Sequence, residues 1–239
     1  MAKIPSWLKF PFWLGSCLAE MILPTVCIGC GRFLDQREYE FCPECLENAR
    51  KRMLSRPIHI KYTDLSFAPF TYSGVVRTAL LQFKFNGKPH YDKALAKYIA
   101  YMLVKLGIEK PDVITYVPTS NMRARKRGYD QAELIARRVS EIANIPLVRA
   151  LDKIRNTPKQ SKLSASERHG NVLGAYDLTD KAFDLYGKRI LLIDDVITTG
   201  ATMSEATKTL REVKPSAIIG AAVAKTGKFH KKRLKLKQQ

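Results

Sequence analysis

The sequence predicts an α/β protein in which helices cover both faces of a parallel sheet, with a small four-cysteine module in front. Short, continuously apolar runs alternate with helical patterns over residues 113–224, which is typical of parallel strands joined by helices. Two C-x-x-C pairs stand close together within residues 27–45. The length of 239 residues, 46% of them hydrophobic, suits one ordinary domain plus a small appendage and argues against a disordered chain.

The charge is strongly unbalanced, because 41 Lys and Arg face only 22 Asp and Glu, giving a formal net charge of +19. This excess predicts attraction to nucleic acid, phosphorylated metabolites or an anionic membrane surface. The alternative is a solvated basic surface that binds nothing. The five cysteines are an odd number in a chain of this size, which argues against a disulfide framework and favours reduced thiols in the cytoplasm.

Residues 1–26 predict a short amphipathic helix. Apolar side chains between Phe10 and Ile22 fall close to one helical stripe, and Glu20 interrupts a run that is too short to span a membrane. We expect this helix to dock on the protein rather than to be a cleaved signal peptide. Contact with a membrane surface, helped by Lys3 and Lys9, is the weaker alternative.

The paired cysteines over residues 27–58 predict a zinc ribbon. The spacing Cys27-x2-Cys30-x11-Cys42-x2-Cys45 supplies four thiolates for a tetrahedral Zn²⁺ site. Because all four ligands are sulfur, we expect a closed structural site. A redox role is weaker, because neither pair is expected to open a helix after a core strand. Cys17 has no partner in this pattern and is expected to be a buried apolar residue.

The segment after Pro57 begins with one strand and two helices. A strand at 64–72 is interrupted by Pro69 and is therefore expected at a sheet edge. Helical patterns at about 75–84 and 91–106 end at the turn dipeptide Asn86-Gly87 and at Gly107.

The remaining chain repeats strand and helix. Apolar strands are predicted at 113–117, 189–193 and 217–224, and a shorter one at 145–148. Helices are predicted at about 129–143 and 202–213, with a basic loop at 118–128 and a long polar stretch at 152–171. We expect the main domain to cover residues 59–226, with a hood at about 59–110, and the basic tail at 227–239 to be disordered.

The most informative stretch is ILLIDDVITTGATMSEA at 190–206. A loop that exposes backbone N–H groups and threonine hydroxyls before a helix is suited to a phosphate, and the adjacent acids Asp194 and Asp195 are suited to vicinal sugar hydroxyls or a hydrated Mg²⁺. Together these features predict a ribose 5-phosphate site. The phosphate-binding residues are Thr198, Thr199, Gly200, Ala201 and Thr202. Two alternatives are a capping box at Thr202-x-x-Glu205 and a Mg²⁺ site of another kind.

The stretch IDDVITTGAT resembles the signature of type I phosphoribosyltransferases that binds 5-phosphoribosyl-1-pyrophosphate (PRPP). Over residues 24–226 the chain resembles the ComF/GntX family of late-competence proteins. The resemblance is carried by the double C-x-x-C, Tyr72-Ser73-Gly74, FKFNG at 83–87, RKRGYDQAELIA at 126–136, and the segment 155–169. Tyr129-Asp130 departs from it, because relatives more often have Phe-Asn. The implied fold is a type I phosphoribosyltransferase-like sheet flanked by helices.

The same resemblance implies further site residues. Arg127 and Gly128 belong to the pyrophosphate loop, where cations stabilise the leaving group. Residues 155–171 form a flexible loop that closes over the ligand, with Gln160, Ser161 and Arg168 as candidates. His169 is expected to be a surface residue. The alternative for the basic loop is a solvated segment or a contact for nucleic-acid phosphates. The nucleic-acid candidates are Arg123, Arg125, Lys126, Lys231, Lys232 and Arg233.

The resemblance implies a cytoplasmic protein that binds PRPP with Mg²⁺ and assists the uptake or processing of single-stranded DNA, together with a helicase-like ATPase. Two alternatives stay open: a phosphoribosyltransferase that acts on an unknown acceptor, and a sensor that binds PRPP without turnover. The sequence does not reveal the acceptor or the oligomeric state.

Overall fold

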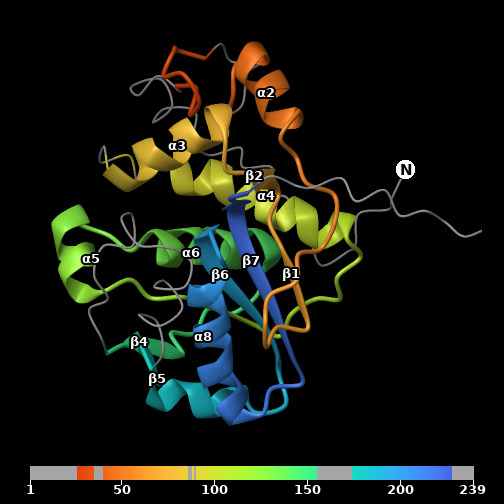
Figure 1. Cartoon of the computed structure of the whole chain (residues 1–239), viewed down its shortest axis with the longest axis vertical. Helices are drawn as coiled ribbons and strands as arrows, with labels where there is room; N and C mark the ends of the chain where they lie inside the picture. Colours follow the sequence, from red (N-terminus) through yellow and green to blue (C-terminus); the bar gives the residue numbers. More distant parts are fainter. Residues whose placement is uncertain (1–25, 35–39, 86–87, 89, 155–173, 228–239) are drawn as a thin grey trace, which may run out of the picture.

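The computed structural model of the chain describes residues 26–34, 40–85, 88, 90–154 and 174–227 (Figure 1). Its centre is a parallel sheet in the order β1-β7-β6-β3. The bounds are Leu65–Phe67 for β1, Ala217–Lys225 for β7, Arg189–Ile197 for β6 and Val113–Tyr116 for β3. A short strand, β2 (Phe70–Thr71), pairs with the far end of β7.

Helices cover the two faces of this sheet (Figure 1). The side chains of Leu191 and Ile193 pack with α4 (Tyr91–Lys105) and α6 (Gln131–Ala143). Ile190 and Leu192 point to the opposite face, against α8 (Ala201–Leu210) and the 3₁₀ helix η2 (Asp180–Leu185). This alternation is what a strand buried on both faces requires, and each such side chain contributes about 1.5–3 kcal/mol.

The parallel register brings the carboxyl ends of β3 and β6 to one edge of the sheet. Tyr116 pairs with Ile193, so the chain that follows β3 lies next to Asp194 and Asp195. Helix α5 (Asn121–Arg127) and then α6 follow β3, while α8 follows β6. Open parallel sheets bind ligands at such an edge, and the polar residues of this chain gather there.

The cysteine module stands at the end of the molecule where α2 (Pro43–Arg50) packs on α3 (Gly74–Phe85) (Figure 1). The side-chain oxygen of Asn48 accepts a hydrogen bond from the backbone N–H of Val75 (3.3 Å). The chain between module and sheet then runs beside the first strands: the backbone N–H of Leu54 donates to the carbonyl of Pro69 (2.7 Å) and that of Ile58 to the carbonyl of Ser66 (2.6 Å).

Most predicted elements are confirmed to within one or two residues. These are the helices at 75–84, 91–106 and 129–143, the strands at 113–117 and 217–224, and the edge strand at 64–72, which divides into β1 and β2 at Pro69. The helix predicted at 202–213 is confirmed as α8 followed by the 3₁₀ turn η3 (Arg211–Val213).

Three predictions were wrong in detail. The strand predicted at 189–193 continues to Ile197, because its pairing with β7 persists through the acidic residues. The strand predicted at 145–148 is a single bridge between Leu147 and Ile114. The basic loop at 118–128 contains α5, which ends where Gly128 adopts a left-handed φ of 82°. The antiparallel pair β4 (Leu151–Lys153) and β5 (Tyr176–Leu178) was not predicted.

Several predictions fall outside the described residues. These are the helix at 1–26 apart from its last residue, the flexible-loop candidates Gln160, Ser161 and Arg168, and the tail candidates Lys231, Lys232 and Arg233. Within the described ranges, no helix combines the length and the apolar character that crossing a bilayer would require.

Candidate functional site

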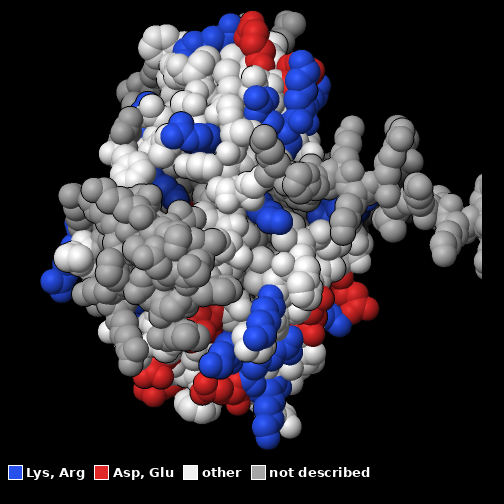
Figure 2. Space-filling view, in the orientation of Figure 1, with Lys and Arg blue, Asp and Glu red and all other residues white. Residues whose placement is uncertain are grey.

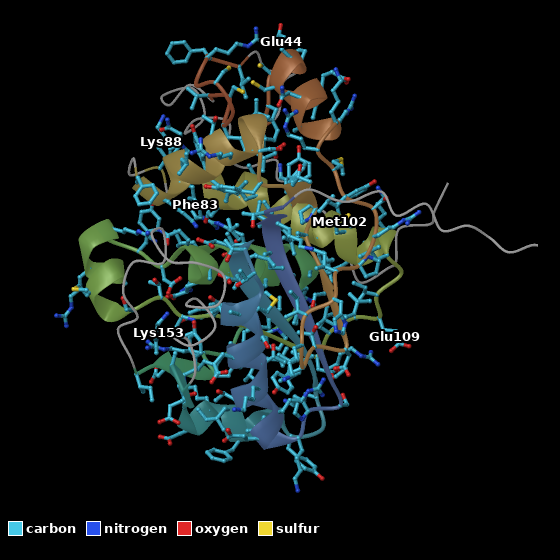
Figure 3. The ribbon with its side chains drawn as sticks, in the orientation of Figure 1. Glu44, Phe83, Lys88, Met102, Glu109 and Lys153 are labelled. Carbon is cyan, nitrogen blue, oxygen red and sulfur yellow. The ribbon has the colours of Figure 1, made fainter. Side chains whose placement is uncertain are left out.

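A cavity of about 270 Å³ opens at the carboxyl ends of β3 and β6. Its walls come from segments that are far apart in the sequence: α3, the loop after β3, the start of α6, the end of β6, the start of α8, and the β4–β5 pair. Lys153, labelled in Figure 3, lines it from β4. It is therefore a site that only the folded sheet assembles.

An acidic cluster forms one wall. Asp194 and Asp195 come from the end of β6, and Asp130 comes from the N-cap of α6. Asp130 is held by the backbone, because its carboxylate accepts hydrogen bonds from the N–H groups of Thr119 (2.6 Å) and Ala132 (3.0 Å). Burial, and to a smaller extent the charge of Asp195, raises the pKa of Asp130 above its ordinary value.

Lys84 reaches this cluster from α3. Its Nζ lies 2.6 Å from Oδ2 of Asp195, and the two side chains are only 19% and 18% exposed. Burial and the neighbouring Asp195 charge raise the pKa of Asp194 to about 7, against the opposing effect of Lys84. The described part of the cavity wall thus carries three carboxylates and three cationic side chains, those of Lys84, Arg127 and Lys153, and Lys84 is ion-paired with Asp195.

The threonine loop lies beside the acids. Thr198 and Thr202 line the same cavity, and Thr199 is exposed and accepts a hydrogen bond from the N–H of Ala201 (3.3 Å). Gly200 has a φ of 82°, and a Cβ there would lie 2.6 Å from Cδ1 of Ile60. The backbone conformation therefore favours glycine at this turn, and the end of the Ile60 side chain would have to shift to admit a Cβ.

The segment after β3 contributes Arg127 and Gln131. Nη1 of Arg127 donates to Oε1 of Gln131 (2.7 Å), and the guanidinium lies 5.1 Å from the centre of the Phe85 ring. Gly128 is exposed at the end of α5 and does not line the cavity. Arg125, on α5, is also exposed and outside the cavity wall. Arg123 and Lys126 lie on the same helix.

Several cavity residues were not predicted from the sequence: Tyr72, Lys84, Asp130, Gln131, Lys153, Tyr176 and Thr226. Tyr72, Lys84, Asp130 and Gln131 lie in the stretches that carry the family resemblance, which was the available signal. Lys153 and Tyr176 belong to the strand pair that was not predicted, and no signal in the sequence marked them.

The four cysteines form a second cluster. Their sulfur atoms all lie within 4.8 Å of one another, and those of Cys30 and Cys42 are 3.8 Å apart. Four sulfurs at about 2.3 Å from one tetrahedral ion are roughly 3.8 Å apart, so the arrangement fits a metal ion. Gly31 turns the first pair with a φ of 82°, and the second pair opens α2, with Cys42 at its N-cap. The cysteines are thus positioned to bind a metal.

The phosphoribosyl transferase domain family model matches residues 110–237, and the chain belongs to this family. This range contains β3, the acidic pair, the threonine loop and the basic segment that borders the cavity.

Among its relatives, the chain is 33% identical to competence protein F of Haemophilus influenzae over 55% of this chain and 60% of that protein. It is 28% identical to competence protein ComFC of Bacillus subtilis over 82% of each chain. It is 26% identical to the DNA utilization protein YhgH of Salmonella typhimurium over 77% of this chain and 83% of that one. These relatives confirm the resemblance to late-competence proteins, although the chain spans less than two thirds of the Haemophilus protein.

Proposed function

We propose that the cavity binds PRPP, or a close ribose phosphate, together with Mg²⁺. The supporting observation is that the acidic pair and the threonine loop border one cavity at the end of β6. In this proposal Asp194 and Asp195 accept hydrogen bonds from the ribose hydroxyls. Thr198, Thr199, Gly200, Ala201 and Thr202 hold the 5-phosphate, and Arg127 with Gly128 faces the pyrophosphate.

The chemistry of the cavity supports this division. A phosphate is repelled by carboxylates, whereas hydroxyl groups donate to them, so a sugar must separate the acids from each phosphate. Carboxylate oxygens are ligands that Mg²⁺ prefers, and Asp194 and Asp195 place two carboxylates next to each other at the cavity wall. One oxygen of Asp195 is held by Lys84, so Asp194 and the other Asp195 oxygen are the available ligands. Bound there, Mg²⁺ would offset phosphate charge.

Isothermal calorimetry of PRPP with Mg²⁺ tests the proposal. We expect the wild type to bind and the double variant Asp194→Asn/Asp195→Asn to lose binding, because both acceptor carboxylates are removed. Asp184→Asn is the matched control, since Asp184 is exposed on η2, outside the cavity wall. A folded, zinc-loaded wild type that binds no ribose phosphate would contradict the ligand assignment.

We also propose that Cys27, Cys30, Cys42 and Cys45 hold a structural Zn²⁺ within a module at 27–58. The closed, all-sulfur cluster supports a structural rather than a catalytic ion. The transferase-like domain would then cover 59–226, with 59–110 as its hood. This division assigns α2 to the zinc module and α3 to the hood that carries Lys84.

At the level of the cell, we propose that the protein assists the uptake or processing of single-stranded DNA in the cytoplasm, alongside a helicase-like ATPase. The names of the relatives and the charge of +19 support this role. On the face in Figure 2, Lys and Arg of the described residues are scattered from top to bottom rather than gathered in one stripe. The proposed contacts are the basic residues that cluster in the sequence. They are the α5 cations, Arg123, Arg125 and Lys126, and the tail cations, Lys231, Lys232 and Arg233.

Fluorescence anisotropy with a labelled single strand over a range of salt concentrations tests this role. Each lost phosphate contact should lower the slope of log affinity against log salt by about 0.7. We expect deletion of 228–239, or neutralisation of Arg123, Arg125 and Lys126, to lower this slope, whereas Lys208→Gln on the exposed side of α8 leaves it unchanged. An intact protein that does not bind the strand at low salt would exclude direct DNA contact.

Release of pyrophosphate from PRPP separates a transferase from a sensor. Turnover that depends on an added acceptor would establish an enzyme. Stable binding without release, over a panel of nucleobases and amines, would favour the sensor.

A further inference from the structure

Gln131 is the first residue of α6 and has an unusual hydrogen-bonding state. Its side chain lines the cavity, yet the residue is only 2% exposed. Its Nε2 is buried and has no hydrogen-bond partner. Leaving a buried polar group unpaired is unfavourable, and such groups in native proteins are usually paired with protein, water or a ligand.

The orientation of this amide follows from its neighbour. Arg127 carries only donors, so its Nη1 requires the amide oxygen of Gln131, and that contact is 2.7 Å. The N–H₂ end is consequently turned away from Arg127 and cannot be exchanged with the oxygen without losing the bond. The sequence thus places a fixed amide donor beside a fixed cation.

Arg127 is itself held in place. Its guanidinium is bonded to Gln131 and lies 5.1 Å from the centre of the Phe85 ring. Arg127 also lines the cavity, and a guanidinium has five N–H groups, so donors beyond the one bonded to Gln131 are available to a ligand. Gln131 and Arg127 thus bring two kinds of side-chain donor together at the cavity wall, and we call them the amide–guanidinium pair.

The acids near this pair have other partners. Asp130, the adjacent residue, accepts from the N–H groups of Thr119 and Ala132, and Asp195 binds Lys84. Neither carboxylate accepts a hydrogen bond from Nε2 of Gln131, which has no partner among the described residues. What the pair lacks is an acceptor oxygen, and an anionic oxygen would suit both donors at once.

We propose that Gln131 is a specificity-determining residue whose amide N–H, beside the Arg127 guanidinium, binds an oxygen of the ligand's diphosphate. The inference rests on the proposed function, and it states what the cavity distinguishes: a ribose phosphate with a diphosphate at C1 is preferred over ribose 5-phosphate. A neutral amide gives this selectivity by geometry. It stabilises an acceptor oxygen only within hydrogen-bonding distance, and it carries no net charge that would attract every anion.

The test compares PRPP with ribose 5-phosphate, each with Mg²⁺, by calorimetry. Gln131→Met keeps the length of the side chain but removes the donor. We expect it to weaken PRPP binding by about 10-fold to 100-fold and to change ribose 5-phosphate binding by less than about 3-fold. Gln131→Glu keeps the shape and the oxygen that faces Arg127 but replaces the donor with a charge. We expect it to weaken PRPP binding further.

Lys208→Gln is the control, since Lys208 is exposed on α8 outside the cavity wall and should leave both affinities unchanged. Because Gln131 is buried, thermal unfolding of each variant is measured first. If Gln131→Met does not fold, the isosteric Gln131→Glu is used for the comparison instead. Unchanged PRPP affinity, or equal losses for both ligands, would overturn the inference. A wild type that binds neither ligand would instead refute the proposed function.

Discussion

The cysteine cluster and the acidic cavity both gather groups that carry negative charge, but they treat that charge differently. In the cluster, Cys27, Cys42 and Cys45 are buried and all four sulfurs face one another. In the cavity, Asp130, Asp194 and Asp195 face an opening, with Lys84 bonded to only one of them. The first arrangement is complete once a single ion is present, whereas the second still contains a buried amide nitrogen, Nε2 of Gln131, that has no partner among the described residues.

This difference is consistent with the proposed roles, a structural metal site for the cysteine cluster and a site that binds and releases a ligand for the cavity. The cluster fixes α2 against α3 and gains nothing by opening, so its ligands can be buried. The cavity retains an unpaired amide and a carboxylate with a raised pKa, and both lower the stability of the ligand-free protein. A ligand that hydrogen-bonds to these groups would remove this destabilisation, and the free energy gained would contribute to its binding affinity.

The largest effect is expected from a substitution in the cysteine cluster. Cys27→Ser removes one of four ligands, and we expect loss of bound zinc and a fall of about 3–5 kcal/mol in the free energy of unfolding. Zinc content and thermal unfolding measure this. Cys17→Ser is the control, because Cys17 lies outside both C-x-x-C pairs and should keep one equivalent of zinc. A Cys27→Ser protein with full zinc content would contradict the assignment.

An intermediate effect is expected in the acidic cavity. Lys84→Met removes the ammonium that lies 2.6 Å from Asp195 and leaves three carboxylates facing the cavity without it. We expect the free energy of unfolding to fall by about 1–3 kcal/mol, measured by denaturant titration, and PRPP affinity to fall with it. Lys181→Met on exposed η2 provides the comparison. Equal stability of the two variants would show that the Lys84–Asp195 pair is unimportant.

The smallest effect is a pH dependence of PRPP affinity, which we expect at the acidic cavity and not at the cysteine cluster. Burial and the Asp195 charge raise the pKa of Asp194 to about 7, so its carboxylate, the form that accepts hydroxyl hydrogen bonds, is lost as the pH falls below 7. PRPP affinity should therefore rise by about tenfold between pH 6 and pH 8. The sign for folding is opposite, since a raised carboxyl pKa removes stability as the pH rises from about 4 to 7.

The phosphates of the ligand also titrate near pH 6, so the pH experiment needs an internal reference. Asp195→Asn removes the neighbouring charge, lowers the pKa of Asp194 and should shift the affinity profile to lower pH while the ligand is unchanged. Zinc content, in contrast, should stay constant over this range. A profile that does not shift in Asp195→Asn would attribute the pH dependence to the ligand alone.

The sequence predicted the parts of the site that depend on local order. Asp194, Asp195 and the 198–202 loop are continuous in the chain, and the strand before them is plainly apolar, so one segment reveals its own chemistry. The main helices and strands were predictable for the same reason, because their periodicity is local.

The remaining site residues depend on long-range geometry. Lys84 meets Asp195 across 111 residues of sequence, and Lys153 and Tyr176 reach the cavity through an antiparallel pair flanking residues 155–173. The extension of β6 through Asp194 was missed because two adjacent acids resemble the end of a strand. Only the pairing of β6 with β7 keeps them extended, and that pairing has no local signature.

The segment that joins the module to the sheet has a consequence for how the two parts can be separated. β1 is an edge strand, and its outer side is covered by the chain at Ile58, which bridges Ser66 in antiparallel fashion. A shortened protein that begins at residue 59 would uncover this edge. Open strand edges recruit other strands, so such a fragment should self-associate and precipitate during purification, while the intact chain protects its own border.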